Sequence, residues 1–360
     1  MLRLKKFKNF TLPCVGQGTE GEDPYGDNHR IKILRCGIDL GITFIDTAEV
    51  YGNGHSEEVV GKAVKGIREK VFISTKFSPA HNRYQDVKFS LEKSLRRLAT
   101  DYVDLYHVHW PNPAVPIEET MKALLELKDA GKIRHIGVSN FTIDDLLAAQ
   151  KASDFQIKSN QIEYNFLERS LGEQILPYAK ENALMIIAYS PLRRSPKGER
   201  ILKNISEKYH RTPTQIVLNW LIMHDNVVPI PKTLNPKHVK ENALCSEFCL
   251  EKEDFENLSN AFRPQLLEVP VRLIRVFGLE KEKIYATLNE AIENRFNLQP
   301  DIRGIAKDIK ENKILKPVQL VPTSDTSGKF TYDLVQGKLR YWAWVYVYGD
   351  DRPICACINE

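Results

Sequence analysis

The sequence predicts an α/β protein in which a closed (β/α)8 barrel, the TIM barrel, is followed by a small α+β domain. Short apolar runs rich in β-branched residues alternate with amphipathic stretches whose apolar residues recur at spacings of three and four. Such alternation is typical of parallel βα units, and eight apolar runs favour a barrel over an open sheet. This rhythm changes after residue 262, so we expect domains at 1–262 and 263–360.

The eight expected strands lie at 14–16, 43–46, 71–75, 103–108, 135–138, 158–162, 185–188 and 227–230. The clearest amphipathic helices between them lie at 87–98, 117–130, 171–181 and 214–223. Before the first strand, residues 1–11 alternate basic and apolar side chains, which predicts a hairpin that plugs the closed end of the barrel.

Composition narrows the class of protein. A chain of 360 residues with 42% apolar side chains can bury one large core and a small one, and a formal charge of +4 gives no reason to expect nucleic acid as a partner. No apolar run is long enough to span a membrane or to form the core of a signal peptide, which predicts a cytoplasmic protein. Six scattered cysteines indicate neither a disulfide framework nor a metal site.

Polar side chains stand where the expected strands end. The ends of the second to fifth strands carry Asp46, Tyr51, Lys76, His109, Ser139 and Asn140. Each one alone has a structural explanation, such as a helix cap, a solvated lysine or a loop histidine. Because the carboxyl ends of parallel strands share one mouth of a barrel, we expect these side chains to converge on a catalytic site.

This set of side chains suits the reduction of a carbonyl group. Hydride addition leaves negative charge on the carbonyl oxygen, which then needs a proton donor. The Tyr51 hydroxyl can donate, although a tyrosine pKa of about 10 is high for this task. The ammonium of Lys76 would lower that pKa, Asp46 would keep Lys76 charged, and His109 would orient the carbonyl. Neither a covalent nucleophile nor a metal is required.

Several motifs occur in a fixed order along the first 262 residues. They are DTAEVYG at 46–52 with Ser56, Glu57 and Gly61 beyond it, ISTK at 73–76, DLY at 104–106 leading to HWP at 109–111, GKIR at 131–134 running into GVSNF at 137–141, NQ at 160–161, AYSPL at 188–192 and IPK at 230–232. In these motifs the chain resembles the aldo-keto reductase family. The resemblance implies a barrel that binds NADP(H) or NAD(H) in extended form, without a Rossmann glycine motif.

The same resemblance assigns roles by motif position. Asp46, Tyr51, Lys76 and His109 would form a catalytic tetrad, with Tyr51 as the acid in reduction and the base in oxidation. Ser139, Asn140 and Gln161 would bind the nicotinamide carboxamide, and Tyr189 would stack on its ring. The complete implied set of cofactor-binding residues is Gly18, Thr19, Ser139, Asn140, Gln161, Tyr189, Ser190, Leu192, Lys232, Thr233, His238, Glu241 and Asn242.

Two positions depart from the family pattern. His238 stands where an arginine normally grips the ribose 2′-phosphate, and a histidine offers no permanently charged fork. Lys232 and Lys237 remain as cations, so both NADPH and NADH stay open. Glu20 stands where an aromatic or apolar residue commonly lines the substrate pocket. With Glu22 and Asp23 nearby it predicts a polar, cationic or hydroxylated substrate, unless these carboxylates simply face water.

The second domain has its own pattern. Arg263 and Pro264 indicate a linker. Strands are expected at 269–276, 316–321, 330–335 and 353–358, and helices at 284–294 and 301–311. The aromatic run from Tyr341 to Tyr348 predicts a helix that packs in a core, in preference to a platform for nucleic-acid bases.

This second domain resembles the ParB/sulfiredoxin-like fold at 302–309, 312–318, 332–340 and 352–354. The resemblance implies a phosphate site at the helix N-terminus with Gly337 and Arg340. Lys338 and Leu339 fill the middle of that motif, so the sulfiredoxin cysteine is absent and its repair activity is not expected. Partition-type DNA binding is not expected either, and a purely structural role remains an alternative.

Two functional hypotheses follow. In the first, the chain is an NAD(P)-dependent oxidoreductase that acts on a small aldehyde, ketone or alcohol, and its second domain shapes the substrate entrance or binds a phosphorylated ligand. In the second, it is a nucleotide-responsive regulatory or binding protein whose barrel senses the cofactor. The intact set of Asp46, Tyr51, Lys76 and His109 favours the first hypothesis.

Overall fold

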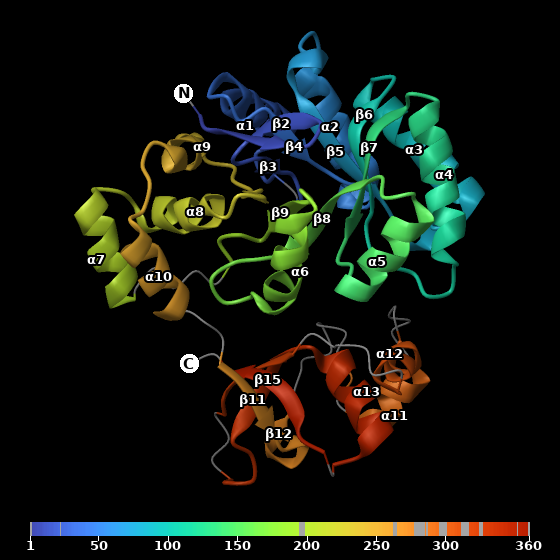
Figure 1. Ribbon diagram of the computed structural model, residues 1–360, viewed down its shortest axis with the longest axis vertical. Coiled ribbons are helices and arrows are strands. Elements are labelled where there is room, and N and C mark those ends of the chain that lie inside the picture. The colour runs from blue at the N-terminus through green and yellow to red at the C-terminus, as the bar shows by residue number, and fades with distance from the viewer. Residues whose placement is uncertain are drawn as a thin grey trace. The chain divides into compact units, whose positions relative to one another are not determined.

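The chain divides into two compact units, Met1–Phe262 and Arg263–Glu360 (Figure 1). The computed structural model describes residues 2–21, 23–193, 199–261, 265–276, 285, 287–294, 301–310, 317–323, 327–350 and 352–358. Glu22 and the linker expected at 263–264 lie outside the described residues.

Eight parallel strands form the sheet of the first unit, and each pairs with the next in sequence order. They are β3 (Gln17–Gly18), β4 (Phe44–Asp46), β5 (Phe72–Phe77), β6 (Val103–Val108), β7 (Ile133–Ser139), β8 (Ile157–Glu163), β9 (Met185–Tyr189) and β10 (Val227–Pro229). Backbone hydrogen bonds from Gly16 to Pro229 (2.9 Å) and from Gly18 to Pro231 (3.3 Å) join the first strand to the last. The predicted barrel is confirmed.

Glycine allows the first and last strands to meet. A Cβ on Gly16 would lie 2.9 Å from Ile230 Cγ2, just after β10, and one on Gly18 would lie 2.8 Å from the carbonyl oxygen of Ile230. The expected strand at 14–16 was placed too early, because Cys14 still pairs with the N-terminal hairpin through its hydrogen bond to the Arg3 carbonyl (2.9 Å). The other seven expected strands overlap β4 to β10.

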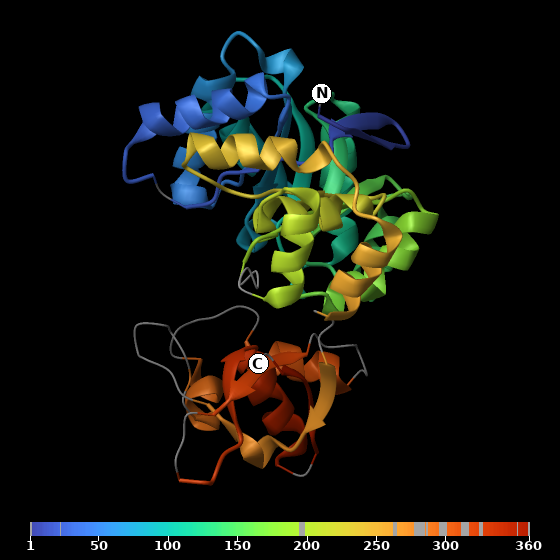
Figure 2. The ribbon, with the colours of Figure 1, turned by 90° about the vertical axis from the view of Figure 1, so that its left-hand side faces the viewer.

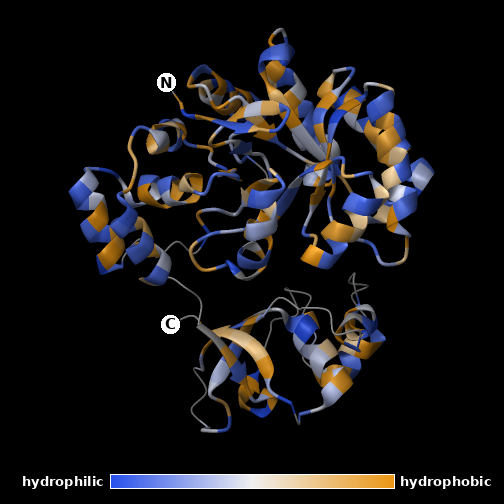
Figure 3. Cartoon of the chain, viewed as in Figure 1, coloured by the Kyte–Doolittle hydropathy of each residue, from blue (hydrophilic) through white to orange (hydrophobic). Residues whose placement is uncertain are grey.

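Helices follow the strands on the outside of the barrel, as α3, α4 and α5 do beside β5 to β8 (Figure 1). They are α1 (Asp27–Asp39), α2 (His55–Val64), α3 (Tyr84–Leu98), α4 (Ile117–Asp129), α5 (Ile143–Ala152), α6 (Ser170–Glu181), α7 (Arg200–Tyr209), α8 (Pro213–Met223), α9 (Pro236–Ala243) and α10 (Lys252–Ala261). Apolar and polar residues mix along them (Figure 3), as the amphipathic pattern predicted. In the described residues no helix is long and apolar enough to cross a membrane.

Local sequence explains several helix boundaries. The hydroxyl of Thr142 caps α5 and that of Thr212 caps α8, each in a reciprocal capping box.

Helix α9 follows β10 and packs against α1 (Figure 2), which completes the ring of helices where the barrel closes.

A hairpin of β1 (Leu4–Phe7) and β2 (Phe10–Pro13) covers the N-terminal ends of the strands. The Phe10 ring lies 5.6 Å from the ring of Phe72, at the start of β5, and 4.6 Å from that of His135 in β7. The prediction of a plug at this end is confirmed, and the opposite end is left as the mouth.

The second unit contains a five-stranded mixed sheet in the order β11-β15-β13-β14-β12. Its elements are β11 (Gln265–Val269), β12 (Ile274–Arg275), α11 (Leu288–Glu293), α12 (Ile302–Lys310), β13 (Val318–Pro322), β14 (Tyr332–Gln336), α13 (Lys338–Tyr348) and β15 (Ile354–Ile358). The single strand expected at 269–276 is wrong. Two strands flank Pro270 and a turn at Val271–Leu273, since proline has no N–H to continue a ladder.

The aromatic run lies on α13, between two small cores. Tyr341 is buried against the sheet, while Ala343 packs in the cluster of α11 and α12, and Trp342 and Trp344 contact both cores. The prediction that the aromatic run packs inside the domain is confirmed for Tyr341, Trp342 and Trp344, whereas Tyr346 is exposed. The start of the helix expected at 284–294 falls partly on residues that are not described, and α11 itself begins after the Thr287 cap.

A buried ion pair ties α2 to its neighbours and provides a test of the fold. The Glu57 carboxylate accepts hydrogen bonds from the Thr75 hydroxyl (2.5 Å) and the Arg97 guanidinium (2.6 Å). We expect Glu57→Ala to lower the free energy of unfolding by about 3 kcal/mol, because it leaves Arg97 unpaired. Glu58→Ala, at an exposed neighbour, should cost under about 0.5 kcal/mol in the same urea titration. Equal losses in the two variants would contradict this interpretation.

Candidate active site

The four predicted catalytic side chains meet at the mouth of the barrel. Asp46 ends β4, Tyr51 begins the turn after it, Lys76 lies in β5 and His109 follows β6. The Lys76 Nζ lies 2.6 Å from Asp46 Oδ2 and 3.3 Å from the Tyr51 hydroxyl. The ring of His109 lies edge-on to that of Tyr51, with 5.9 Å between centroids. Strand order therefore brings residues 63 positions apart into one cluster (109 − 46).

Lys76 is fully enclosed, and each of its ammonium hydrogens has an acceptor. The acceptors are the Asp46 carboxylate, the Thr47 carbonyl at 2.8 Å and the Tyr51 hydroxyl. Burial acts to lower the pKa of Lys76, but the charges and hydrogen bonds of Asp46 and Tyr51 outweigh it and raise the pKa. The site therefore holds a permanent ammonium beside the tyrosine hydroxyl.

The Tyr51 hydroxyl stays protonated at neutral pH. Burial is the largest influence and raises its pKa, Lys76 lowers it, and Asp46 and Glu20 raise it, so the net shift is upward. Lys76 thus acts in the predicted direction, but desolvation, which the sequence argument did not weigh, is stronger. The protonated hydroxyl can donate a hydrogen bond.

His109 is neutral in this environment. Burial and the nearby charge of Lys76 lower its pKa to about 3. Its Nδ1 is buried and has no hydrogen-bond partner among the described residues, while its backbone carbonyl accepts from the Asn140 side chain at 3.2 Å. A neutral imidazole offers one donor and one acceptor.

The side chains expected at the nicotinamide adjoin this cluster. Asn140 donates to the Ser139 hydroxyl (3.0 Å) and accepts from the Tyr189 hydroxyl (2.9 Å). Gln161 Nε2 donates to Asp46 Oδ1 at 2.8 Å. The expected cofactor residues are therefore connected to the predicted tetrad through Gln161, a link that the sequence did not indicate.

Two of these positions have unusual backbone geometry. Asn140, just after β7, has φ of 62°, and Ser190, just after β9, has φ of 50°. Such values are uncommon for residues other than glycine and gather at functional sites. Both residues lie at the end of the barrel where the predicted catalytic side chains meet, so their backbone geometry is a second observation that favours a functional site there.

Arg30 extends the site beyond the predicted residues through its contact with Thr19, which was predicted. The Thr19 hydroxyl donates to the Asp46 carbonyl at 2.9 Å, and the buried Arg30 guanidinium donates to the Thr19 carbonyl and to Ser56. Arg30 was not predicted. In the sequence it is one polar residue of the amphipathic α1, and only the packing of α1 against α2 buries it.

The residues expected at the adenosine end lie around β10 and α9. Lys232 is exposed, and its Nζ lies 3.2 Å from the place a Cβ on Gly21 would take. Thr233 lies 3.5 Å from His238 Nδ1, and the Glu241 carboxylate accepts from Thr212. Leu192 is half-buried; residues 194–198 beyond it lie outside the described part.

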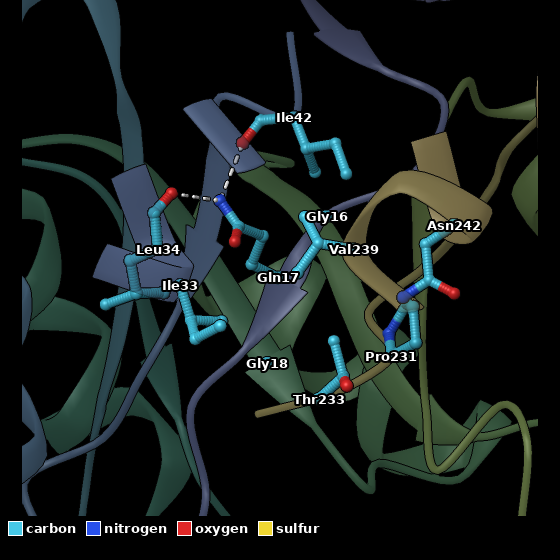
Figure 4. Close-up of a pocket in the computed structure, with 10 residues that line it drawn as sticks. All are labelled: Gly16, Gln17, Gly18, Ile33, Leu34, Ile42, Pro231, Thr233, Val239 and Asn242. Atoms are coloured by element: carbon cyan, nitrogen blue, oxygen red, sulfur yellow. Dashed lines mark hydrogen bonds between the residues drawn. The ribbon is translucent and has the colours of Figure 1, made fainter. Parts of the chain in front are cut away.

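A cavity of about 20 Å³ lies between β3, α1 and α9 (Figure 4). Its lining residues come from both ends of the barrel sheet and are Gly16, Gln17, Gly18, Ile33, Leu34, Ile42, Pro231, Thr233, Val239 and Asn242. Gln17 spans it to the carbonyls of Leu34 (3.2 Å) and Ile42 (2.9 Å). It has room for about one water, so it is a gap in the packing beside the adenosine-end residues.

A nicotinamide dinucleotide fits the donor set of this mouth. The buried polar atoms for which no hydrogen-bond partner is found among the described residues include His109 Nδ1 beside the tetrad and Asn242 Oδ1 on α9. Buried polar groups are normally hydrogen-bonded, so both atoms favour a polar ligand at these places. His109 belongs to the predicted tetrad, and Asn242 belongs to the predicted cofactor set.

Comparison with known proteins relates the first unit to a known enzyme family. Residues 14–262 match the model of the aldo/keto reductase family. Methylglyoxal reductase YeaE of Escherichia coli is 38% identical over 263 residues, which are 71% of this chain and 92% of that protein. Glyoxal reductase of Bacillus subtilis is 34% identical over 259 residues, 71% of this chain and 91% of that protein.

Solved structures give the same answer. The aldo/keto reductase of Klebsiella pneumoniae in complex with NADP and acetate has a TM-score of 0.70 and 34% identity, covering 74% of this chain and 97% of that one. The thermostable aldo-keto reductase Tm1743 has a TM-score of 0.69 and 40% identity, covering 72% and 99%. The chain therefore belongs to the aldo-keto reductase family and is an NAD(P)-dependent oxidoreductase.

Proposed function

We propose that this chain is a cytoplasmic reductase of small aldehydes and ketones in which Tyr51 donates the proton. The observation that carries the proposal is the enclosed ammonium of Lys76, held between the Asp46 carboxylate and the Tyr51 hydroxyl at the barrel mouth. The names of the relatives YeaE and glyoxal reductase supply the substrate class, short 2-oxoaldehydes such as methylglyoxal and glyoxal.

The residues divide the chemistry among them. The nicotinamide, when bound, supplies the hydride. Tyr51 gives its proton to the carbonyl oxygen, and the positive charge of Lys76 stabilises the phenolate that remains. Asp46 keeps Lys76 charged and in place. The neutral imidazole of His109 orients the substrate carbonyl through a hydrogen bond.

Cofactor positioning is assigned to the ends of β7, β8 and β9. Ser139, Asn140 and Gln161 hold the carboxamide and Tyr189 stacks on the ring. Gln161 also contacts Asp46, so the residue that would position the nicotinamide also supports the charge next to Tyr51. This link couples cofactor placement to the proton donor.

We propose NADP(H) as the working cofactor. The Klebsiella relatives are solved with NADP and with NADPH. In this chain the exposed ammonium of Lys232 is available to the 2′-phosphate, with His238 and Thr233 beside it. Because His238 replaces a guanidinium fork, the preference over NAD(H) should be modest.

We also propose that residues 263–360 form a ParB/sulfiredoxin-like domain that binds a phosphorylated ligand. Gly337 precedes α13 with φ of 92°, and the Arg340 guanidinium folds over it, 2.7 Å from the place a Cβ would take. This arrangement gathers backbone N–H groups and a cation at one helix N-terminus, which suits phosphate.

Replacing the proton donor tests the proposed reaction. Tyr51→Phe should lower kcat for methylglyoxal reduction by about 10²–10⁴-fold, the usual contribution of a general acid, while the Kd for NADPH changes less than about twofold. Steady-state kinetics and fluorescence titration measure the two quantities. Tyr178→Phe, on α6 and outside the tetrad, is the matched control. Undiminished turnover in Tyr51→Phe would overturn the role of Tyr51.

The pH profile tests the neutral state of His109. With its pKa lowered to about 3 and that of Tyr51 raised, neither group changes protonation between about pH 5 and about pH 8. We therefore expect kcat/KM for reduction to stay flat across this window. An inflection near the ordinary histidine value of about 6.5 would show that His109 titrates in the working range.

Nucleotide binding tests the second domain. With NADPH saturating the barrel, ATP should bind the full chain by calorimetry, and Arg340→Gln should raise its Kd at least about tenfold by removing a charge-assisted contact. Arg303→Gln, at an exposed position on α12, should leave the Kd unchanged. If the unmodified chain gives no heat of binding with ATP, this site does not bind a nucleoside triphosphate.

A further inference from the structure

Glu20 is an acidic side chain at the barrel mouth for which no hydrogen bond or ion pair with the described residues is found. It is exposed, and it follows Thr19 directly beyond the end of β3. Asp46, by contrast, is paired with Lys76, and Asp23 in the same loop is paired with His29 at 2.8 Å. The charge of Glu20 is thus available to an incoming molecule.

The position of Glu20 is fixed by its neighbour. The Thr19 hydroxyl donates a hydrogen bond to the Asp46 carbonyl (2.9 Å) and accepts one from the Ser56 hydroxyl (2.9 Å). The Thr19 carbonyl accepts a hydrogen bond from the buried guanidinium of Arg30. These contacts tie the first residue of the loop to the strand that carries Asp46. Glu20 therefore stands beside the tetrad instead of on a loosely held loop.

The charged groups of the tetrad are balanced among themselves, without Glu20. Lys76 and Asp46 neutralise one another, and His109 is uncharged at neutral pH. The field of Glu20 reaches the reacting group, because it is among the influences that raise the pKa of Tyr51. Lys232 lies over the adjacent Gly21 but makes no ion pair with Glu20. Glu20 therefore contributes a negative charge near Tyr51 that no ion pair with the described residues offsets.

We propose that Glu20 is a specificity residue that excludes carbonyl substrates bearing a carboxylate, so that the enzyme takes uncharged or cationic aldehydes and ketones. This inference rests on the reduction proposed above and narrows its substrate class. Like charges held a few ångströms apart at a protein surface repel enough to change an equilibrium about 5- to 10-fold, and salt weakens the effect. Uncharged 2-oxoaldehydes escape this repulsion, and 2-oxoacids do not.

The test uses two substrates of nearly equal size, methylglyoxal and glyoxylate, with the NADPH-loaded full chain. The unmodified enzyme should prefer methylglyoxal in kcat/KM. Glu20→Gln should raise kcat/KM for glyoxylate about 5- to 10-fold and change that for methylglyoxal less than about twofold. Glu20→Lys should raise the glyoxylate value further. The discrimination by the unmodified enzyme should shrink as ionic strength rises.

Glu69→Gln is the matched control, since it removes an exposed carboxylate from the turn before β5, at the opposite end of the barrel. It should leave the ratio of the two kcat/KM values unchanged. If neither Glu20 variant alters that ratio while methylglyoxal is still reduced in a Tyr51-dependent way, the role of Glu20 is wrong and the proposed function stands. If the unmodified enzyme reduces no carbonyl, both fail.

Discussion

The ion pair between Lys76 and Asp46 is the interaction on which the site depends. Enclosing an ammonium and a carboxylate costs roughly several kcal/mol of lost hydration per ion. Their mutual attraction and further hydrogen bonds must offset that cost. Here the Thr47 carbonyl, the Tyr51 hydroxyl and the Gln161 amide supply those bonds. The pair is stable only because four neighbouring segments converge on it, so site and barrel form together.

The barrel keeps water away from the base of this pair. Gly16 and Gly18 let the first strand approach the last, and the aromatic contact of Phe10 with Phe72 and His135 covers the opposite end. Beneath the tetrad, His107 bridges the hydroxyls of Ser74 (3.1 Å) and Ser159 (2.8 Å) across the interior. Burial lowers the pKa of His107 far below its usual range, so it adds no charge under Lys76.

A dry interior also explains the balance of charge at the mouth. Desolvation outweighs the ammonium at Tyr51 and leaves the tyrosine as a protonated donor. An unpaired carboxylate near such a donor interacts with it more strongly than in bulk water, because the protein between them has a lower effective dielectric constant than water. Glu20 is exposed, yet it is among the groups that raise the pKa of Tyr51. In the role proposed above, it would also repel anionic molecules that approach the mouth.

The sequence by itself determined the alternation of strands and helices, the plug hairpin and the placement of Asp46, Lys76 and His109 at strand ends. These features depend on periodicity and on the order of residues, both of which are local. It could not place β3, because that strand is defined by its contact with residues more than 200 positions away, at 229–231.

Tertiary structure alone decided the direction of the Tyr51 pKa shift, the contact of Gln161 with Asp46 and the burial of Arg30. Each depends on how much water is removed and on distances between segments remote in the chain, and neither quantity is written in a local pattern. The sequence contains Pro270 within the strand expected at 269–276, so a break at this position could have been predicted from the sequence. Its consequence, two strands on opposite edges of a mixed sheet, followed only from the packing of the second unit.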